Sequence, residues 1–185
     1  MQQAFVFENV AVLVFPWFEP GEPAERGTRV EVRLLEPQPQ RGSRFAAQRV
    51  VIDHPVFRAD LFDQVTSPPG NLKSAHFHPN FEGVEPSDRF WRDEVKKDPA
   101  GWLASELSDL GKVLERGGVD TSGVAWVESD AAAVRDAIPA IVAACEATQL
   151  QAHARLVRAN NAGERVAVAL PRVREPADYL RLKVF

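Results

Sequence analysis

The order of apolar and polar residues in the first half of the chain predicts β-strands. Residues 4–7 and 10–15 are rich in β-branched and aromatic side chains and are separated by Glu8-Asn9, which fits either a short hairpin or one bent strand. In residues 29–34, Arg, Glu and Arg alternate with Val, Val and Leu. This alternation predicts a half-buried strand with one charged face, since successive side chains of a strand point to opposite faces.

Further strands follow in the pattern, separated by turn residues. Residues 44–53 are the predicted partner of the strand at 29–34. His54-Pro55 predicts a bend, because proline cannot donate to a ladder and pushes the preceding residue to extended geometry. Residues 56–65 and 74–77 are the next expected strands. Strands that follow one another in this way predict an antiparallel meander.

The second half of the chain changes to the period of an α-helix. Asp98 is the predicted N-cap and Pro99 the first helical residue, and apolar residues follow at three- to four-residue spacing until Gly117. A second helix is expected to begin near Ser129 or Asp130, with Pro139 kinking or dividing it. The end of the chain returns to a strand pattern, in which residues 150–158 and 165–170 flank a turn and predict a β-hairpin.

These elements predict an α+β fold with an antiparallel β meander in the first half, two or three helices packed on it and a C-terminal β-hairpin. The chain has 185 residues, of which 45% are hydrophobic and 26% charged, and this is the size and composition of one globular domain. We expect a single domain over 1–185, mainly β over 1–82 and mainly α over 98–148, with the hairpin and tail at 149–185.

Charge and cysteine content exclude several classes of protein. The net charge of −4 argues against a nucleic-acid-binding protein, which needs clustered Lys and Arg to neutralise phosphates. No apolar stretch reaches the roughly 18 to 20 residues that span a bilayer, so a membrane span is not expected. The one cysteine, Cys145, cannot form an internal disulfide and fits a reducing compartment, which predicts a cytoplasmic location. Its position on an apolar helical face predicts a buried, inert thiol.

The segment around His76 and His78 carries the most informative candidate chemistry. On a strand, side chains at i and i+2 point to the same face with α-carbons about 7 Å apart, so both imidazoles can reach one ion. Glu82 would add a carboxylate. Two imidazoles and one carboxylate suit Zn, Fe, Mn or Ni and leave open positions for a substrate. The alternative interpretation is that both histidines pack beside Phe77 and Phe81 without a metal.

The same segment resembles the first sequence motif of the cupins. That motif is a glycine, five residues, His-x-His, three or four residues and a glutamate, and here it falls on Gly70, His76, His78 and Glu82. The resemblance covers only this short stretch and implies a jelly roll. Cupins take a further histidine from a second motif, and the surroundings of His153, the only downstream histidine, do not match that motif. A helix pattern also follows where returning strands would be expected.

A longer part of the chain resembles an uncharacterised family of small bacterial proteins. In that family a segment like residues 51–62, which contains His54-Pro55, precedes a His-x-His-Pro-x-Phe segment like residues 76–81. The family has no assigned function, so the resemblance implies no activity.

Two further residues are candidates for a catalytic site. His54 would give a three-histidine site or a His/Asp acid–base pair if it folded beside His76 and His78. Asp60 and Asp63 follow it at positions that alternate to opposite faces of a strand, so one of them is expected at the surface. Arg89 could clamp a substrate carboxylate or lie at the surface.

Two functions from different classes agree with these patterns. The first is a small-molecule enzyme in which His76, His78, His54 and Arg89 act in catalysis and a divalent metal binds His76, His78 and Glu82. The second is a non-catalytic subunit without a metal, which binds another protein or its own copy through the apolar run at 4–18 or the basic region at 155–183.

Overall fold

The first half of the chain folds into a five-stranded antiparallel sheet. The computed structural model describes residues 2–47, 49–122 and 125–161. The strands lie side by side in sequence order, as β1 (Gln3–Val6), β2 (Val10–Glu19), β3 (Glu25–Pro37), β4 (Val50–Gln64) and β5 (His76–His78). The predicted meander is therefore confirmed, and β1 and β2 form a hairpin instead of one bent strand. A small two-stranded hairpin, β6 (Phe81–Glu82) and β7 (Glu85–Pro86), follows the sheet.

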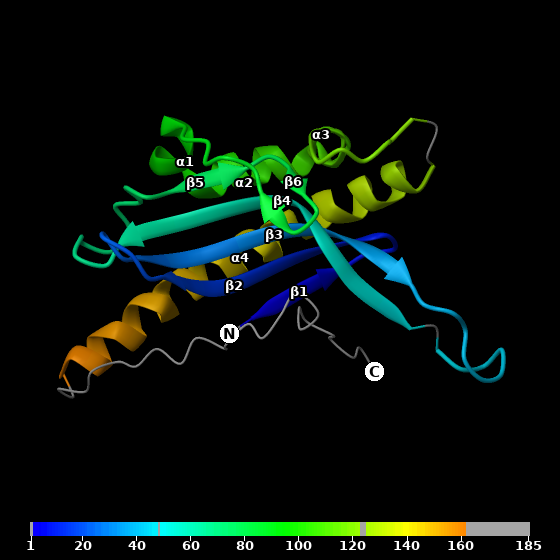
Figure 1. Cartoon of the computed structure of the whole chain (residues 1–185), viewed down its shortest axis with the longest axis horizontal. Helices are drawn as coiled ribbons and strands as arrows, with labels where there is room; N and C mark the ends of the chain where they lie inside the picture. The colour runs from blue at the N-terminus through cyan, green and yellow to red at the C-terminus, as the bar shows by residue number, and fades with distance from the viewer. Residues whose placement is uncertain (1, 48, 123–124, 162–185) are drawn as a thin grey trace.

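Four helices follow the strands. They are α1 (Asp93–Lys97), α2 (Pro99–Ser108), α3 (Leu110–Arg116) and α4 (Ala125–Asn161). Figure 1 shows the long helix α4 running behind the sheet and α1, α2 and α3 gathered near β4 and β5. The predicted α+β class is thus confirmed. Within the described residues, none of these helices combines the length and apolar character needed to cross a lipid bilayer.

The predicted helix at 98–117 is two helices. Asp98 caps α2 as expected, because its Oδ1 accepts a hydrogen bond of 2.9 Å from the Gly101 N–H. Asp109 then caps α3 in the same way, accepting from the Lys112 N–H at 3.3 Å. A second capping carboxylate inside the apolar repeat therefore divides the helix without disturbing its buried face.

The last helix differs from the prediction at both ends. It begins at Ala125 and runs past Pro139 as one element, so Asp130 lies within it and not at its cap. Residues 150–158, predicted as a strand, are the final turns of α4. This stretch is rich in Gln, Ala, Leu and Arg, and these strong helix formers outweigh its weak alternation. The remainder of the predicted C-terminal hairpin lies outside the described residues.

Strand β4 includes residues of two strands that the sequence pattern predicts separately, at 44–53 and 56–65. Residues 44–47 and 49 lie in the loop before it, and Val50–Gln64 form one continuous strand. His54-Pro55 does not end the strand, because the register of β3 and β4 shifts around Arg33 and accommodates the proline as an irregularity. The strand predicted at 74–77 is also displaced, to His76–His78.

One face of the sheet packs on the helices and forms the main core. Residues of β2, β3, β4 and β5 contribute to it, among them Val12, Val30, Phe57 and Phe77. Helices α2, α3 and α4 supply residues such as Leu103, Leu107, Leu114 and Ile141. Cys145 lies in this core, as the sequence predicts, and burial raises the pKa of its thiol to about 12.

The opposite face of the sheet carries the charged residues. The prediction of a half-buried strand with an exposed charged face is wrong in one respect, because these side chains are also buried. Arg29, Glu31 and Arg33 retain only 5%, 2% and 6% of their surface. Buried charges are stable only when they are paired, so this face must hold a network of partners.

Candidate metal centre

The strand register aligns two rows of polar residues on the face away from the helices. Each row takes one residue from β3, one from β4 and one from β5, directly across from each other. The rows are Arg29–Asp60–His76 and Glu31–Arg58–His78. Directly opposite side chains in antiparallel strands have β-carbons about 5 Å apart, so each row places its side chains in contact.

Asp60, His76 and His78 form a compact group at the end of these rows. One ligand atom from each residue lies within 4.8 Å of the other two. The Asp60 Oδ2 atom is 3.4 Å from His76 Nε2 and 3.6 Å from His78 Nε2. The side chains of Asp60 and His76 are each 1% exposed and that of His78 is 7% exposed. The group therefore combines the donor types of a metal site in a buried setting.

Backbone carbonyls fix the protonation pattern of both imidazoles. The Nδ1 atom of His76 lies 2.7 Å from the Ser74 carbonyl oxygen, and that of His78 lies 2.6 Å from the Ser87 carbonyl oxygen. A carbonyl only accepts, so each Nδ1 must carry the proton and donate. In the neutral imidazole each Nε2 then presents a lone pair toward Asp60. His76 Nε2 is buried and has no hydrogen-bond partner within the described residues.

Two of the three separations within the group match those of ligands around one ion. Nitrogen and oxygen ligands lie about 2.0–2.2 Å from zinc, and at tetrahedral angles such ligands are about 3.3–3.6 Å from one another. The two distances from Asp60 Oδ2 fall at this value. A charge-assisted hydrogen bond would be shorter, about 2.7–2.9 Å.

Arg29 holds the carboxylate of Asp60 in place. Its Nε and Nη2 atoms donate to Oδ1 and Oδ2 at 2.6 and 3.0 Å, and the guanidinium lies 4.1 Å from the ring centroid of Trp17. Burial by itself raises the pKa of Asp60. The charge of Arg29 and the hydrogen bonds that it donates act in the opposite direction and favour the ionised carboxylate. Asp60 is therefore an ionised, oriented candidate ligand.

The second row extends the charged network. Glu31 is 2% exposed and accepts from Arg33 Nε at 2.7 Å and from Arg58 Nε at 2.9 Å. Burial lowers the pKa of Arg58, and the neighbouring charge of Arg29 acts in the same direction. One carboxylate thus pairs with the buried guanidinium of Arg33 and the partly exposed guanidinium of Arg58.

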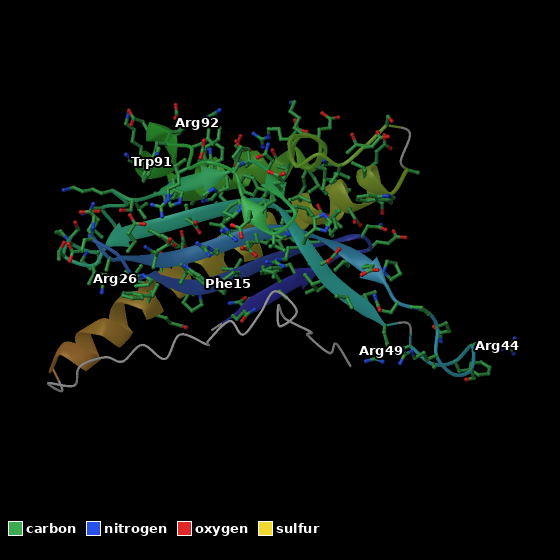
Figure 2. All side chains as sticks on the ribbon, viewed as in Figure 1. Phe15, Arg26, Arg44, Arg49, Trp91 and Arg92 are labelled. Atoms are coloured by element: carbon green, nitrogen blue, oxygen red, sulfur yellow. The ribbon has the colours of Figure 1, made fainter. Side chains whose placement is uncertain are left out.

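Loops on both sides of β5 position the histidines. Asp63, on the helix-facing side of β4, accepts from the backbone N–H groups of Gly70 and Leu72 at 2.8 and 2.6 Å. These bonds anchor the loop that leads into β5. Phe77 and Phe90 exchange two backbone hydrogen bonds, which brings the following residue, Trp91, against His76 with ring centroids 5.0 Å apart. Figure 2 shows Trp91 at this edge of the molecule, and its side chain is half exposed.

Three residues predicted for the site lie outside the group. Glu82, predicted as a metal ligand, is exposed on β6. His54 is exposed at a distant part of β4, where its Nδ1 lies 3.0 Å from Asp53 Oδ2, so the predicted three-histidine site is not formed. Arg89 is occupied by Glu25 and Glu19 at 3.2 and 3.3 Å.

The third member of the group is the one that sequence reasoning missed. Asp60 and Asp63 do point to opposite faces, but both are buried, so the expectation of an exposed one is wrong. The sequence holds one signal for Asp60. Charged residues alternate in both strands, at 29, 31 and 33 and again at 58 and 60, and two such strands side by side would form a paired, buried layer.

The fold also departs from the cupin pattern that the sequence suggests. Gly70 and the two histidines are present, but Glu82 does not join them, and the described sheet is a meander covered by helices on one face. Comparisons of the chain with protein-family models, curated proteins and solved structures find no match. The argument for function therefore rests on the group itself.

Proposed function

We propose that this protein is a small-molecule enzyme that uses a divalent transition metal bound by Asp60, His76 and His78. Two imidazoles and a carboxylate form a donor set that suits Zn, Fe, Mn or Ni. Three protein ligands leave coordination positions for water or substrate. A metal in such a position can polarise a bound oxygen atom or lower the pKa of bound water toward neutrality.

The observation that carries the proposal is the direction of the two Nε2 lone pairs. Both Nδ1 atoms lie at hydrogen-bond distance from backbone carbonyls, so each imidazole in its neutral form turns a lone pair toward an ionised carboxylate. Three electron-pair donors that face one another repel unless a cation lies between them. Metal-binding histidines commonly donate a hydrogen bond from their other ring N–H to a carbonyl or carboxylate in this way.

A proton on one Nε2 is the other means of satisfying these atoms. The group would then be an acid–base pair or a buried ion pair, and the imidazolium would donate to Asp60. The separations of 3.4 and 3.6 Å favour the metal, because they exceed the length of such a bond and equal that between two ligands of one ion.

Metal analysis tests the proposal directly. Protein purified without an affinity tag or chelator, and then supplied with Zn, Fe, Mn or Ni, is expected to retain close to one ion per chain after desalting. Asp60→Asn and His78→Gln are expected to lose it, with circular dichroism used to verify that each variant is folded. Folded wild-type protein that binds none of the four metals would show that the proposal is wrong.

Two exposed residues provide matched controls. Glu82→Gln and His54→Gln remove the same chemical groups at positions outside the cluster. Both variants are expected to bind metal as the wild type does. Loss of metal in Glu82→Gln would instead favour the ligand set predicted from the sequence.

Catalysis requires a separate measurement. The metal-loaded protein is incubated with a mixture of small metabolites, and compounds that change are identified by NMR. Turnover is expected to disappear when a chelator is added and in Asp60→Asn, and to persist in Glu82→Gln. Turnover that survives in Asp60→Asn would contradict the assignment of this group as the active site.

The alternative of a non-catalytic binding subunit gains less support. The apolar run at 4–18 forms β1 and β2, and its central residues from Val10 to Val14 are buried within the sheet. It is therefore not a free apolar surface. The side chains of the basic region at 155–183 lie outside the described residues.

A further inference from the structure

Arg58, beside the proposed metal ligands, has hydrogen-bond donors that are not used within the described residues. Its Nε atom donates to Glu31, and within the described residues it makes no other hydrogen bond. The two terminal nitrogens, Nη1 and Nη2, are not fully buried, and the side chain is 13% exposed. A guanidinium with two unused donor atoms can bind two oxygen atoms of a carboxylate or phosphate at once.

Arg58 also lies on the more exposed side of the group. It is directly opposite His78 in the β4–β5 pair. Exposure rises from 1% for the side chains of Asp60 and His76 to 7% for His78 and 13% for Arg58. Trp91 covers His76, whereas Arg58 has the ring of Phe81 at 5.0 Å on one of its faces. A small molecule that reaches the group from this side meets Arg58 first.

The charge of the network favours a negative ligand once a metal is bound. Ion pairs join equal numbers of cationic and anionic side chains on this face. They are Arg29, Arg33, Arg58 and Arg89, with Glu19, Glu25, Glu31 and Asp60. A divalent ion adds two positive charges that no side chain of this set offsets. In a buried setting such an excess is costly, and a bound anion reduces it.

We propose that the site takes a small oxyanion, a carboxylate or a phosphate compound, with two of its oxygen atoms on Nη1 and Nη2 of Arg58 and another on the metal. This inference rests on the proposed function and assigns it a substrate class. Because binding free energies are coupled reciprocally, the anion raises the affinity for the metal and the metal raises the affinity for the anion.

Cobalt titration tests this coupling, since the visible spectrum of Co²⁺ reports its coordination. Wild-type protein is titrated with Co²⁺ in chloride buffer, with malonate and with inorganic phosphate. Either oxyanion is expected to tighten Co²⁺ binding about tenfold and to change the spectrum. The more effective of the two identifies the substrate as a carboxylate or as a phosphate compound.

Variants of two arginines locate the subsite. Arg58→Met is expected to bind Co²⁺ alone as the wild type does and to lose the response to the oxyanion. Arg58→Lys keeps the charge that Glu31 faces and is expected to fold and to retain a reduced response, because it lacks the two-donor fork. Arg89→Met, which removes a guanidinium already paired with Glu19 and Glu25, is expected to respond fully.

The possible outcomes distinguish failure of the oxyanion subsite from failure of the proposed metal centre. If the wild type does not bind Co²⁺ or any of Zn, Fe, Mn and Ni, the proposed metal centre is wrong, and the proposed oxyanion subsite is then wrong as well. If the wild type binds Co²⁺ equally well with and without either oxyanion, the metal centre stands and the subsite is wrong. An unchanged response in both Arg58 variants would also overturn the subsite.

Discussion

Asp60 on β4 lies directly opposite His76 on β5, with 3.4 Å between the carboxylate Oδ2 and the imidazole Nε2. Arg29 holds both oxygens of the same carboxylate from the neighbouring strand. These atoms, which we propose as metal ligands, are thus oriented by the sheet itself. Ligands held on strands and supported by further hydrogen bonds are the arrangement expected of a preorganised site.

The first prediction concerns stability with and without metal. An ion that binds only the folded state at about 100 times its dissociation constant stabilises that state by about 2.7 kcal/mol. For a chain of this size we expect the melting temperature to rise by about 5–10 °C and to fall again when a chelator is added. Thermal unfolding followed by circular dichroism measures the shift. Asp60→Asn should show none, and an equal shift in that variant would point to a different site.

The second prediction concerns Glu31, the buried carboxylate between Arg33 and Arg58. Glu31→Gln removes the negative charge that faces the buried guanidinium of Arg33 and the partly exposed guanidinium of Arg58. We expect a loss of about 3–5 kcal/mol in the free energy of unfolding, measured by urea denaturation. Glu36→Gln, an exposed position on the same strand, is the control and should change little. Equal stability of the two variants would mean that the network contributes nothing to folding.

The third prediction concerns Asp130, which ties α4 to the first hairpin. Its carboxylate accepts from the backbone N–H groups of Glu8 and Asn9 at 3.1 and 2.8 Å, although the residue lies far along the chain and is 2% exposed. Asp130→Ala leaves both donors without their partner, so we expect a loss of about 1–3 kcal/mol in the free energy of unfolding. The exposed Asp136→Ala on the same helix serves for comparison. A similar small effect of both changes would contradict the predicted role.

The fourth prediction concerns Cys145. Burial, assisted by the charge of Glu146, raises the pKa of its thiol to about 12, whereas an exposed thiol in the unfolded chain ionises near about 8.5. The folded protein should therefore resist a thiol reagent at pH 8 and react only after unfolding. Rapid reaction of the native protein would show that the thiol is accessible.

The same pKa difference makes the stability of the fold depend on pH. Below about pH 8.5 the thiol keeps its proton in both the folded and the unfolded chain, so its full contribution to the free energy of unfolding is present. As the pH rises from there toward 12, the unfolded chain loses the proton that the folded chain retains, so stability falls by about 1.4 kcal/mol per pH unit. Cys145→Ala should flatten this part of the alkaline profile relative to the wild type, and an unchanged slope would contradict it.

The sequence by itself determined the local elements of this protein. The alternation at 29–34 and the Asp98-Pro99 cap each act over a few residues, and each forms the element it predicts. The apolar repeat that follows is helical as predicted, but Asp109 divides it into α2 and α3. The meander also follows from sequence, because strands that are consecutive in the chain tend to pair with each other. His76 and His78 are found together for the same reason, as residues two apart on one strand.

Only the tertiary structure decided which carboxylate joins them. Glu82 is near in sequence but lies on a separate hairpin, whereas Asp60 reaches His76 across the β4–β5 register. A shift of one residue in that register would have placed Asp60 and His76 on opposite faces of the sheet. The alternating charges at 58 and 60 mark one face of β4, but they do not specify which residue of β5 lies opposite Asp60. The burial of Arg29, Glu31 and Arg33 depends on the same pairing, because charged side chains enter the interior only when neighbouring strands bring their partners.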